Sequence, residues 1–568
     1  MKKSYGAVAR EVATPQRRAL GLVIAIFLVG VQVRPRPQLV SVKVEAMNDY
    51  EKRFGRIMNG AQDELGFVVL ELFQPTTLRL EATRCEWHLA FLDDDARTRV
   101  GCEIEVEATQ VGEYESYVAY AGGRANFVIL ARYVRREMRD LTRRDFDLYL
   151  NGVHAMWKSS SYLANKHLIH SAQKECDSWH GNANFLVAHV AFTMEFEQLL
   201  QAKEPRTCAH YWDYTIDAAR GEGWVDSPVF EWYGRANNRD HIVSTSTWAY
   251  TPLTRGGNVT NAYGLLMAPW NTIRTPFVTR SQQLWGWHHN GKLVDCAKFK
   301  YGASQPSFAA LISFVDVKLH SKVHAWLGGA WNNVPEIIAS EQLVLDQLTI
   351  TNLPLLLEIK KRLWRSGVAR CPDYCGFDGP CECVLNSYFE NMTAFQILDY
   401  TGAFLDLWDV NITNVTAWDE ILHEATNTGW MGTMLSDGSP QDPMFWIIHQ
   451  MQERLFFALR WYKWTGGLVF DDHYGDPLPH HYFDWSVVDG YPYLPNMTWS
   501  RSCPGTLPGD LMAFENLLRN TPTSSRHTNV EFYNMTGPFS IHTNYVYDHL
   551  TNFTQCGDIV KQEGTFSS

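Results

Sequence analysis

Histidines stand in three separate stretches of this chain that each carry a helical pattern, and this placement constrains its fold more than any other feature. His320 and His324 are four residues apart in LHSKVHAWLGG, so on a helix both rings lie on one face. His180 and His189 flank the start of a second apolar pattern, WHGNANFLVAHVAFTMEFE. His449 follows a proline that can open a third helix, in SPQDPMFWIIHQMQERLFF. The pattern predicts helices whose histidines face a common interior.

These three stretches supply five imidazoles and a segment just upstream can supply a sixth, so that no thiolate or carboxylate is needed. Two more candidates, His167 and His170, lie just upstream in ANKHLIH. All-nitrogen ligation suits copper or zinc, and helical bundles build such sites from facing helices. Ser321 and Lys322 follow the first histidine of the close pair, so the pair is not the H-E-x-x-H motif of zinc proteases.

These motifs resemble those of the tyrosinase family, the dinuclear (type 3) copper proteins that include catechol oxidases and molluscan haemocyanins. The family's first copper motif has a histidine, eight residues and a second histidine closely followed by Phe-Glu. The matching residues are His180, His189 and Phe196-Glu197, then His210-Tyr211-Trp212-Asp213-Tyr214, then His320 and His324 with Gly328-Gly329, then Asp442, Pro443, Phe445 and His449. The resemblance covers roughly residues 140 to 460.

The resemblance implies a mainly α fold, with a four-helix-bundle dinuclear copper core and long loops, and the small β-rich N-terminal domain that precedes it lies outside this common core. It implies two copper ions, each held by three neutral imidazoles, and oxidation of o-diphenols to o-quinones by dioxygen. The metal ligands that it implies are His167, His180, His189, His320, His324 and His449. For the first ligand, His170 is the second choice and His154 the third. The substrate would be a small phenol, whose identity the sequence leaves open.

The sequence departs from the family pattern at several positions. Glu453 stands where the last motif usually has Asp, and Val190 stands where Arg usually follows the third histidine of the first copper site. Ser321 replaces the Asn that many monophenol-hydroxylating tyrosinases carry after the first histidine of the second copper site. Strong monophenolase activity is therefore not expected.

Three acidic residues of the matched motifs are candidates for roles around the metal ligands. Asp442, Asp213 and Glu197 are expected mainly as helix caps or as partners of buried arginines such as Arg454.

Cys176 lies four residues before His180. Some family members have a thioether between a cysteine and the second histidine of the first copper site. A disulfide from Cys176 to Cys208 or to another cysteine is the preferred interpretation, and the odd count of eleven leaves one cysteine over.

Changes in hydrophobic pattern and composition along the chain predict four segments. Residues 1–33 are a signal peptide or signal anchor, and residues 34–138 are a β-rich domain that a Cys85–Cys102 disulfide could clip together. Thr142, as an N-cap, would open the first helix of a copper-binding core spanning 139–500. Residues 501–568 form a tail that packs on that core.

The N-terminus and the glycosylation sequons indicate the secretory pathway. Basic residues precede the apolar run 20–33, LGLVIAIFLVGVQV, which is short for a membrane span and typical of a signal sequence. The RPRP that follows is a poor cleavage site, so an uncleaved anchor stays open. Sequons occur at Asn258, Asn391, Asn411, Asn414, Asn496, Asn534 and Asn552. Together with eleven cysteines they favour an extracellular or lumenal protein.

The net charge and the lack of internal repeats exclude further classes of function. With 50 Lys and Arg against 62 Asp and Glu, the formal net charge is −12, so nucleic acid is not an expected partner. Two alternatives to a phenol oxidase remain: a dioxygen-binding copper protein without turnover, and a noncatalytic glycoprotein with a vestigial metal site. A single unit without repeats argues against haemocyanin-like arrays. The oligomeric state is left open.

Overall fold

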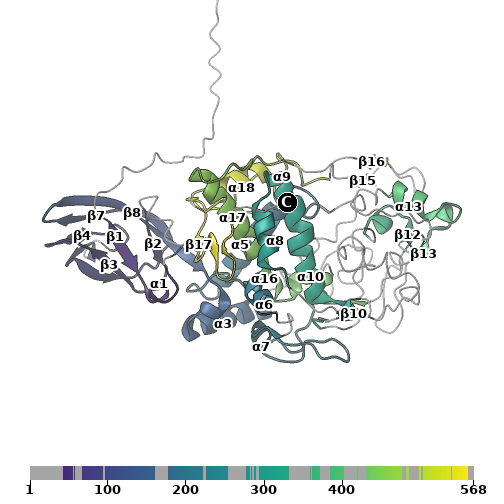
Figure 1. The fold of residues 1–568 in the computed structure, drawn as a ribbon, viewed down its shortest axis with the longest axis horizontal. Helices are drawn as coiled ribbons and strands as arrows, with labels where there is room; N and C mark the ends of the chain where they lie inside the picture. The colour runs from purple at the N-terminus through teal and green to yellow at the C-terminus, as the bar shows by residue number, and fades with distance from the viewer. Residues whose placement is uncertain are drawn as a thin grey trace, which may run out of the picture. The chain divides into compact units, whose positions relative to one another are not determined.

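The computed structural model describes residues 43–560 with gaps, of which the longest are 58–66, 160–169, 171–176, 254–274, 332–358, 371–383, 402–418, 423–429, 476–481 and 485–497. All the described residues belong to one compact unit, residues 37–568 (Figure 1). The predicted signal segment 1–33, His167 and Cys176 lie outside the described residues.

Strands dominate the N-terminal part of the chain. They are β1 (Val44–Met47), β2 (Phe67–Glu71), β3 (Thr76–Leu80), β4 (Glu86–His88), β5 (Thr98–Val100), β6 (Glu103–Val106), β7 (Gly112–Tyr120) and β8 (Gly123–Arg135), with helix α1 (Asp49–Phe54) after β1. One sheet has the order β1-β3-β6 and is antiparallel, and in the other β5, β4, β7 and β8 follow one another, with β2 parallel to β8. Leu78 and Leu80 alternate with more exposed residues along β3, as expected of a strand with one buried face. The predicted Cys85–Cys102 disulfide is present and is thereby confirmed.

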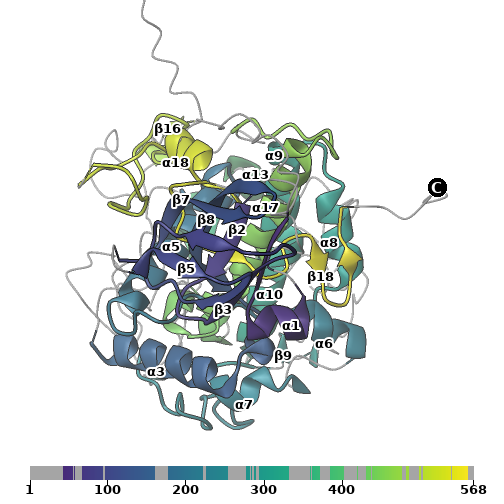
Figure 2. The ribbon, with the colours of Figure 1, turned by 90° about the vertical axis from the view of Figure 1, so that its left-hand side faces the viewer.

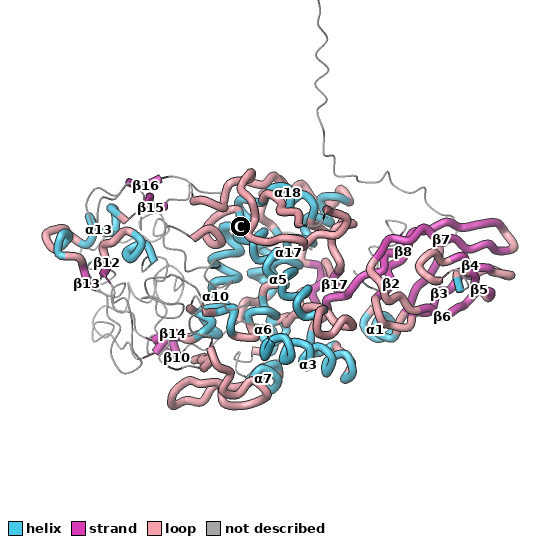
Figure 3. The backbone as a smooth tube through the Cα atoms, turned by 180° about the vertical axis from the view of Figure 1, so that it is seen from behind, coloured by secondary structure: helices cyan, strands magenta, loops and turns pink. Residues whose placement is uncertain are grey.

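The C-terminal tail adds a strand to this second sheet. Strand β17 (Tyr545–Tyr547) pairs in parallel with the end of β8, with Tyr545 opposite Tyr133 (Figure 3). The tail also contributes Phe514, Phe532 and Phe553 to the main hydrophobic core.

From residue 143 onward the longer regular elements are helices, which Figure 2 shows around the strands of the N-terminal sheet. They are α3 (Arg143–Ser159), α5 (Asn184–Gln201), α6 (Tyr214–Arg220), α7 (Val229–Tyr233), α8 (Cys296–Ala303), α9 (Phe308–Phe314), α10 (Ser321–Gly328), α13 (Ala394–Tyr400), α16 (Phe445–Ile448), α17 (Gln450–Trp464) and α18 (Asn529–Met535). The predicted cap of α3 is confirmed, because Thr142 Oγ1 accepts a hydrogen bond from the backbone N–H of Asp145 at 3.2 Å. Short strands also occur: β9 (Gln283–Leu284), β10 (Trp287–His288), β11 (Ala330–Trp331), β12 (Ala369–Arg370), β13 (Val384–Leu385), β14 (Trp430–Met431), β15 (Tyr482–Asp484), β16 (Thr498–Ser500), β18 (Asn552–Phe553) and β19 (Gly557–Asp558).

Two helical segments carry three of the candidate histidines, namely His189 on one and His320 and His324 on the other. Helix α5 packs against α3 and against α17. Residues 308–328 form one continuous helical segment, because a π-helical stretch, Val315–His320, joins α9 to α10. The four-helix bundle around a metal pair stays a prediction.

The cysteines correct one expectation. Cys208 is a buried free thiol whose Sγ lies 3.3 Å from the carbonyl oxygen of Val134. It therefore forms no disulfide with Cys176, so Cys208 is wrong as the partner of Cys176, and a disulfide from Cys176 to another cysteine stays a prediction. The reason is spatial, since Cys208 faces the end of strand β8 and is sealed there with 2% of its surface exposed.

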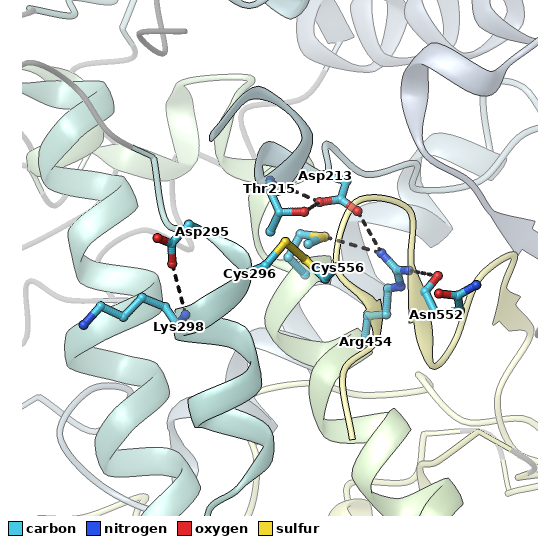
Figure 4. Close-up of a disulfide and its surroundings, with 9 residues drawn as sticks. Asp213, Thr215, Asp295, Cys296, Lys298, Arg454, Asn552 and Cys556 are labelled. Atoms are coloured by element: carbon cyan, nitrogen blue, oxygen red, sulfur yellow. Dashed lines mark hydrogen bonds and ion pairs between the residues drawn. A yellow bond between two sulfur atoms is a disulfide. The ribbon is translucent and has the colours of Figure 1, made fainter. Parts of the chain in front are cut away.

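A second disulfide, which the sequence did not indicate, joins the start of helix α8 to the tail. Cys296 and Cys556 are 260 residues apart in the chain (Figure 4). Cys503 is disulfide-bonded as well. Disulfides of this kind are typical of proteins that fold in an oxidising compartment.

Removing the Cys296–Cys556 disulfide should destabilise the protein more than removing Cys85–Cys102. The two bridges span 260 and 17 residues, and the chain-entropy argument makes the longer loop worth about 2 kcal/mol more. Midpoints of urea unfolding for the Cys296→Ser/Cys556→Ser and Cys85→Ser/Cys102→Ser double variants measure this difference. Equal losses, or a larger loss from the short loop, would contradict it.

Two observations bear on where the protein resides. Within the described residues, no helix combines the length and the apolar character that crossing a bilayer requires. Three of the seven sequon asparagines are described, Asn391, Asn534 and Asn552, and each is exposed.

Candidate metal centre

Six histidine rings converge in the interior, from helix α5 and the turn before it, from the 308–328 helical segment, from the α16–α17 junction, and from residue 170. They are His170, His180, His189, His320, His324 and His449. One ligand atom each from His170, His180 and His189 lies within 4.8 Å of the others, and the same holds for His189, His320 and His449. The Nε2 atom of His449 is 3.1 Å from that of His320 and 3.3 Å from that of His324.

Backbone carbonyls set the orientation of three of these rings. The Nδ1 atoms of His189 and His449 each lie 2.6 Å from the carbonyl oxygen four residues earlier in the chain. The Nδ1 atom of His324 lies 2.7 Å from the carbonyl oxygen of Met434. Because a carbonyl only accepts, each Nδ1 carries the proton and each Nε2 presents a lone pair to the cluster.

His180 is held by a carboxylate instead. Its Nδ1 lies 3.1 Å from both carboxylate oxygens of Asp177. The same side chain accepts the backbone N–H of Trp179 and of His180, which closes the turn before α5. Lys361, almost fully buried, places its Nζ 3.4 Å from Asp177. Asp177 therefore fixes both the backbone of the turn and the ring that the turn carries.

Asp316 lies on the π-helical stretch, four residues before His320. One of its oxygens is 3.4 Å from the Nδ1 of His320, and that Nδ1 has no hydrogen-bond partner. The other oxygen accepts the backbone N–H of Gly181 at 2.5 Å. Short π-helical segments often occur at functional sites. Here one places a carboxylate from the helical segment that carries His320 beside the turn that carries His180.

Burial keeps most of the cluster neutral. It lowers the pKa of His170, His189, His320 and His449 well below the usual value, and neighbouring imidazoles lower it further. The pKa of His324 falls to about 3, again chiefly through burial. For His180, burial also lowers the pKa, but the Asp177 carboxylate outweighs it and the net shift is upward. Five rings are thus neutral near pH 7 and offer lone pairs.

Two of the three candidates for the first ligand of the predicted set are described. His167, the first choice, lies outside the described residues. His170, the second choice, is buried, and its Nε2 is 3.2 Å from that of His189. His154, the third choice, packs its ring against Trp248 at a centroid distance of 5.3 Å. Of these three candidates, the structure brings His170 into the cluster.

The acidic candidates make the structural contacts expected of them. Asp442 forms a two-pronged ion pair with Arg280, at 2.7 and 2.6 Å, and accepts the backbone N–H of Met444 just before α16. Asp213 caps α6 and lies 3.4 Å from Arg454 (Figure 4). Glu197 pairs with Arg135 at 2.9 Å. These carboxylates anchor the elements that carry the histidines.

Gly328 makes possible the close approach that orients His324. A Cβ at this position would lie 2.3 Å from the backbone nitrogen of Leu435. Since real Cβ atoms do not come that close, only glycine lets the 434–435 backbone reach the helix end. That backbone carries the Met434 carbonyl that receives the His324 proton.

Gly328→Ala should therefore lower both stability and metal affinity. The displaced backbone is expected to cost about 1–3 kcal/mol, as overpacking does. Misorienting one ligand ring should weaken metal binding by about 10–100-fold. Thermal unfolding and competition with a chelator measure the two effects. Gly509→Ala is the matched control, because nothing lies within 4 Å of its added Cβ, and equal behaviour of the two variants would refute the argument.

The donor set fits a metal pair. The lone pairs of His324 and His449 face each other across 3.3 Å with both Nδ1 protons already committed to carbonyls. Two lone pairs so placed repel each other unless a cation lies between them. The cluster holds imidazole nitrogens at its centre, and such ligands suit copper or zinc.

The sequence did not single out the residues that hold the ligand rings. Asp177 and Asp316 stand three and four residues before a candidate ligand, so their spacing was a usable signal. No local pattern marks Lys361 or the Met434 carbonyl, because both reach the site through the fold.

Comparisons with known proteins give little support beyond this geometry. No family model matches the sequence, and no curated protein matches it. Two solved structures of a tyrosinase from Burkholderia thailandensis, at high and at low pH, are similar at 15% identity. Each alignment covers 73% of this chain and 74% of that one, with a TM-score of 0.30. A score that low carries no argument about fold or chemistry.

Proposed function

We propose that this chain binds two copper ions and oxidises o-diphenols to o-quinones with dioxygen. The observation that carries the proposal is the set of buried Nε2 atoms that face one another, with the Nδ1 atoms of His189, His324 and His449 each held by a backbone carbonyl. Three imidazoles would hold each ion: His170, His180 and His189 on one side, and His320, His324 and His449 on the other. The choice of copper over zinc rests on the resemblance of the histidine motifs to those of tyrosinases.

Copper, when bound, supplies the electron transfer between the diphenol and dioxygen. Two diphenols give up four electrons and four protons to one dioxygen, which leaves as two waters with two quinones. The protein keeps the rings neutral, fixes their tautomers and excludes bulk water from the site. The five rings of His170, His189, His320, His324 and His449 are each at most 7% exposed.

The burial of the histidine rings also favours one alternative, a protein that binds dioxygen and does not oxidise a substrate. A closed pocket would admit dioxygen and exclude a phenol ring. The two functions share the metal pair and differ in the entry of the diphenol.

Purified full-length protein loaded with copper tests the proposal. We expect two copper ions per chain by elemental analysis, and dioxygen uptake together with quinone absorbance when catechol is added. The zinc-loaded protein is the control, because zinc has no redox chemistry in proteins. Two copper ions without quinone formation would support the dioxygen-binding alternative, and fewer than two would overturn the proposal.

A further inference from the structure

We propose that Asp316 is a positioning residue that couples the two halves of the histidine cluster, so that metal binding in one half favours binding in the other. This inference rests on the proposed function, since it concerns how the copper pair is assembled. It arises from one side chain whose two oxygens face different halves of the site.

The first contact is with the half that holds His180. The Asp316 oxygen accepts the N–H of Gly181 at 2.5 Å, directly after His180 in the chain. Gly181 has a positive φ of 68°, which glycine adopts without strain. This hydrogen bond joins the turn to a helix 135 residues further along the chain.

The second contact is with the half that holds His320. The other oxygen is 3.4 Å from the His320 Nδ1, which lacks a hydrogen-bond partner. When Nε2 binds a cation, the ring's proton must sit on Nδ1, and it becomes a stronger donor. The carboxylate is there to accept it, as metal-binding histidines usually require of a neighbouring group.

Coupling follows because the two contacts share one rigid carboxylate. With a cation bound by His320, Nδ1 would donate to one Asp316 oxygen, and this hydrogen bond would fix the plane of the carboxylate. The Gly181 N–H, and with it the turn that carries His180, is then ordered before the second ion arrives. The rings of His180 and His320 are also nearly parallel, with centroids 5.6 Å apart. Asp177 orders the same turn, but from within its own half of the site.

Asp316→Asn tests the inference. Asparagine keeps the volume of the side chain, but only its oxygen accepts a hydrogen bond, whereas its NH2 group donates. Full-length protein is titrated with Cu(I), and native mass spectrometry counts the chains that carry zero, one or two ions. We expect the dissociation constant of the second copper ion to rise relative to that of the first by about five-fold or more. At half saturation, a larger fraction of the chains should then carry one copper ion. A merely structural role would weaken both constants by one factor and leave their ratio unchanged.

Two further variants make the result decisive. Val317→Ala lies on the same π-helical stretch at an exposed position and should leave the ratio as in the unmodified protein. Asp316→Ser makes the same test if the asparagine variant fails to fold. Two copper ions bound with an unchanged ratio in the folded variant would overturn the coupling alone. An unmodified protein that takes up fewer than two ions would overturn the proposed function with it.

Discussion

His449→Ala is expected to reduce the copper content from two ions to about one per chain and to abolish quinone formation. Its Nε2 lies 3.1 Å from that of His320 and 3.3 Å from that of His324, and its ring is stacked on that of His189 at 4.9 Å. His449 thus contacts rings of both halves. Removing a group that only orients a metal ligand lowers metal affinity or activity by about 10–100-fold. Removing the ligand itself should therefore lower the rate of catechol oxidation by more than about 100-fold.

His154→Ala is the matched control for this prediction. It removes an imidazole that packs on Trp248 and was itself a candidate ligand by sequence. We expect it to keep both copper ions and the rate of the unmodified protein. Elemental analysis and quinone absorbance should be measured on the same samples, with circular dichroism to verify folding. A His449→Ala protein that retains two ions and most of its rate would show that the cluster is not the copper site.

Local spacing predicted one pair of histidines in this centre, and the resemblance to tyrosinase motifs implied the rest of the set. His320 and His324 lie on one helical face because they are four residues apart, and the structure brings them together with the other predicted histidines that it describes. The β-type runs before residue 136 were predictable from their own local pattern. The Cys85–Cys102 bridge and the Thr142 cap were predictable because they join residues only 17 and three positions apart.

Long-range contacts were not predictable in this way. Strand β17 pairs with β8 across more than 400 residues, and Cys208 faces Val134 rather than another cysteine. The sequence could not rank His170 above His167, because both lie in the same short motif. Such choices are made by packing between distant segments, which the pattern of one segment does not contain.

Arg135 is the most consequential of these long-range contacts. It comes from the end of strand β8 and is fully buried between Glu197 on α5 and Glu453 on α17, at 2.9 and 2.7 Å. The hydroxyls of Tyr545 and Tyr547 on β17 donate to Glu453. One guanidinium therefore ties the N-terminal sheet and the tail to the two helices that carry or follow His189 and His449.

Arg135→Met should destabilise the protein by about 3–5 kcal/mol, because it leaves two buried carboxylates without their cation. The midpoint of chemical unfolding measures this loss. The matched variant Arg135→Met/Glu197→Gln/Glu453→Gln removes the stranded charges as well, and it should recover a large part of the stability although it loses more of the native contacts. If the triple variant is no more stable than Arg135→Met, the unpaired buried carboxylates are not the cause of the lost stability.

The pH dependence gives an independent check on the same variant. Burial raises the pKa of Glu453 in the folded protein, and Arg135 opposes that shift. Without Arg135, the pKa of Glu453 should rise further above its unfolded value. A carboxyl group whose pKa is raised by folding lowers stability as pH increases from the unfolded pKa to the folded one. The gap in unfolding free energy between Arg135→Met and the unmodified protein should therefore be smaller at pH 5 than at pH 8. A gap that widens toward acid would mean that the carboxylates find another cation when Arg135 is removed.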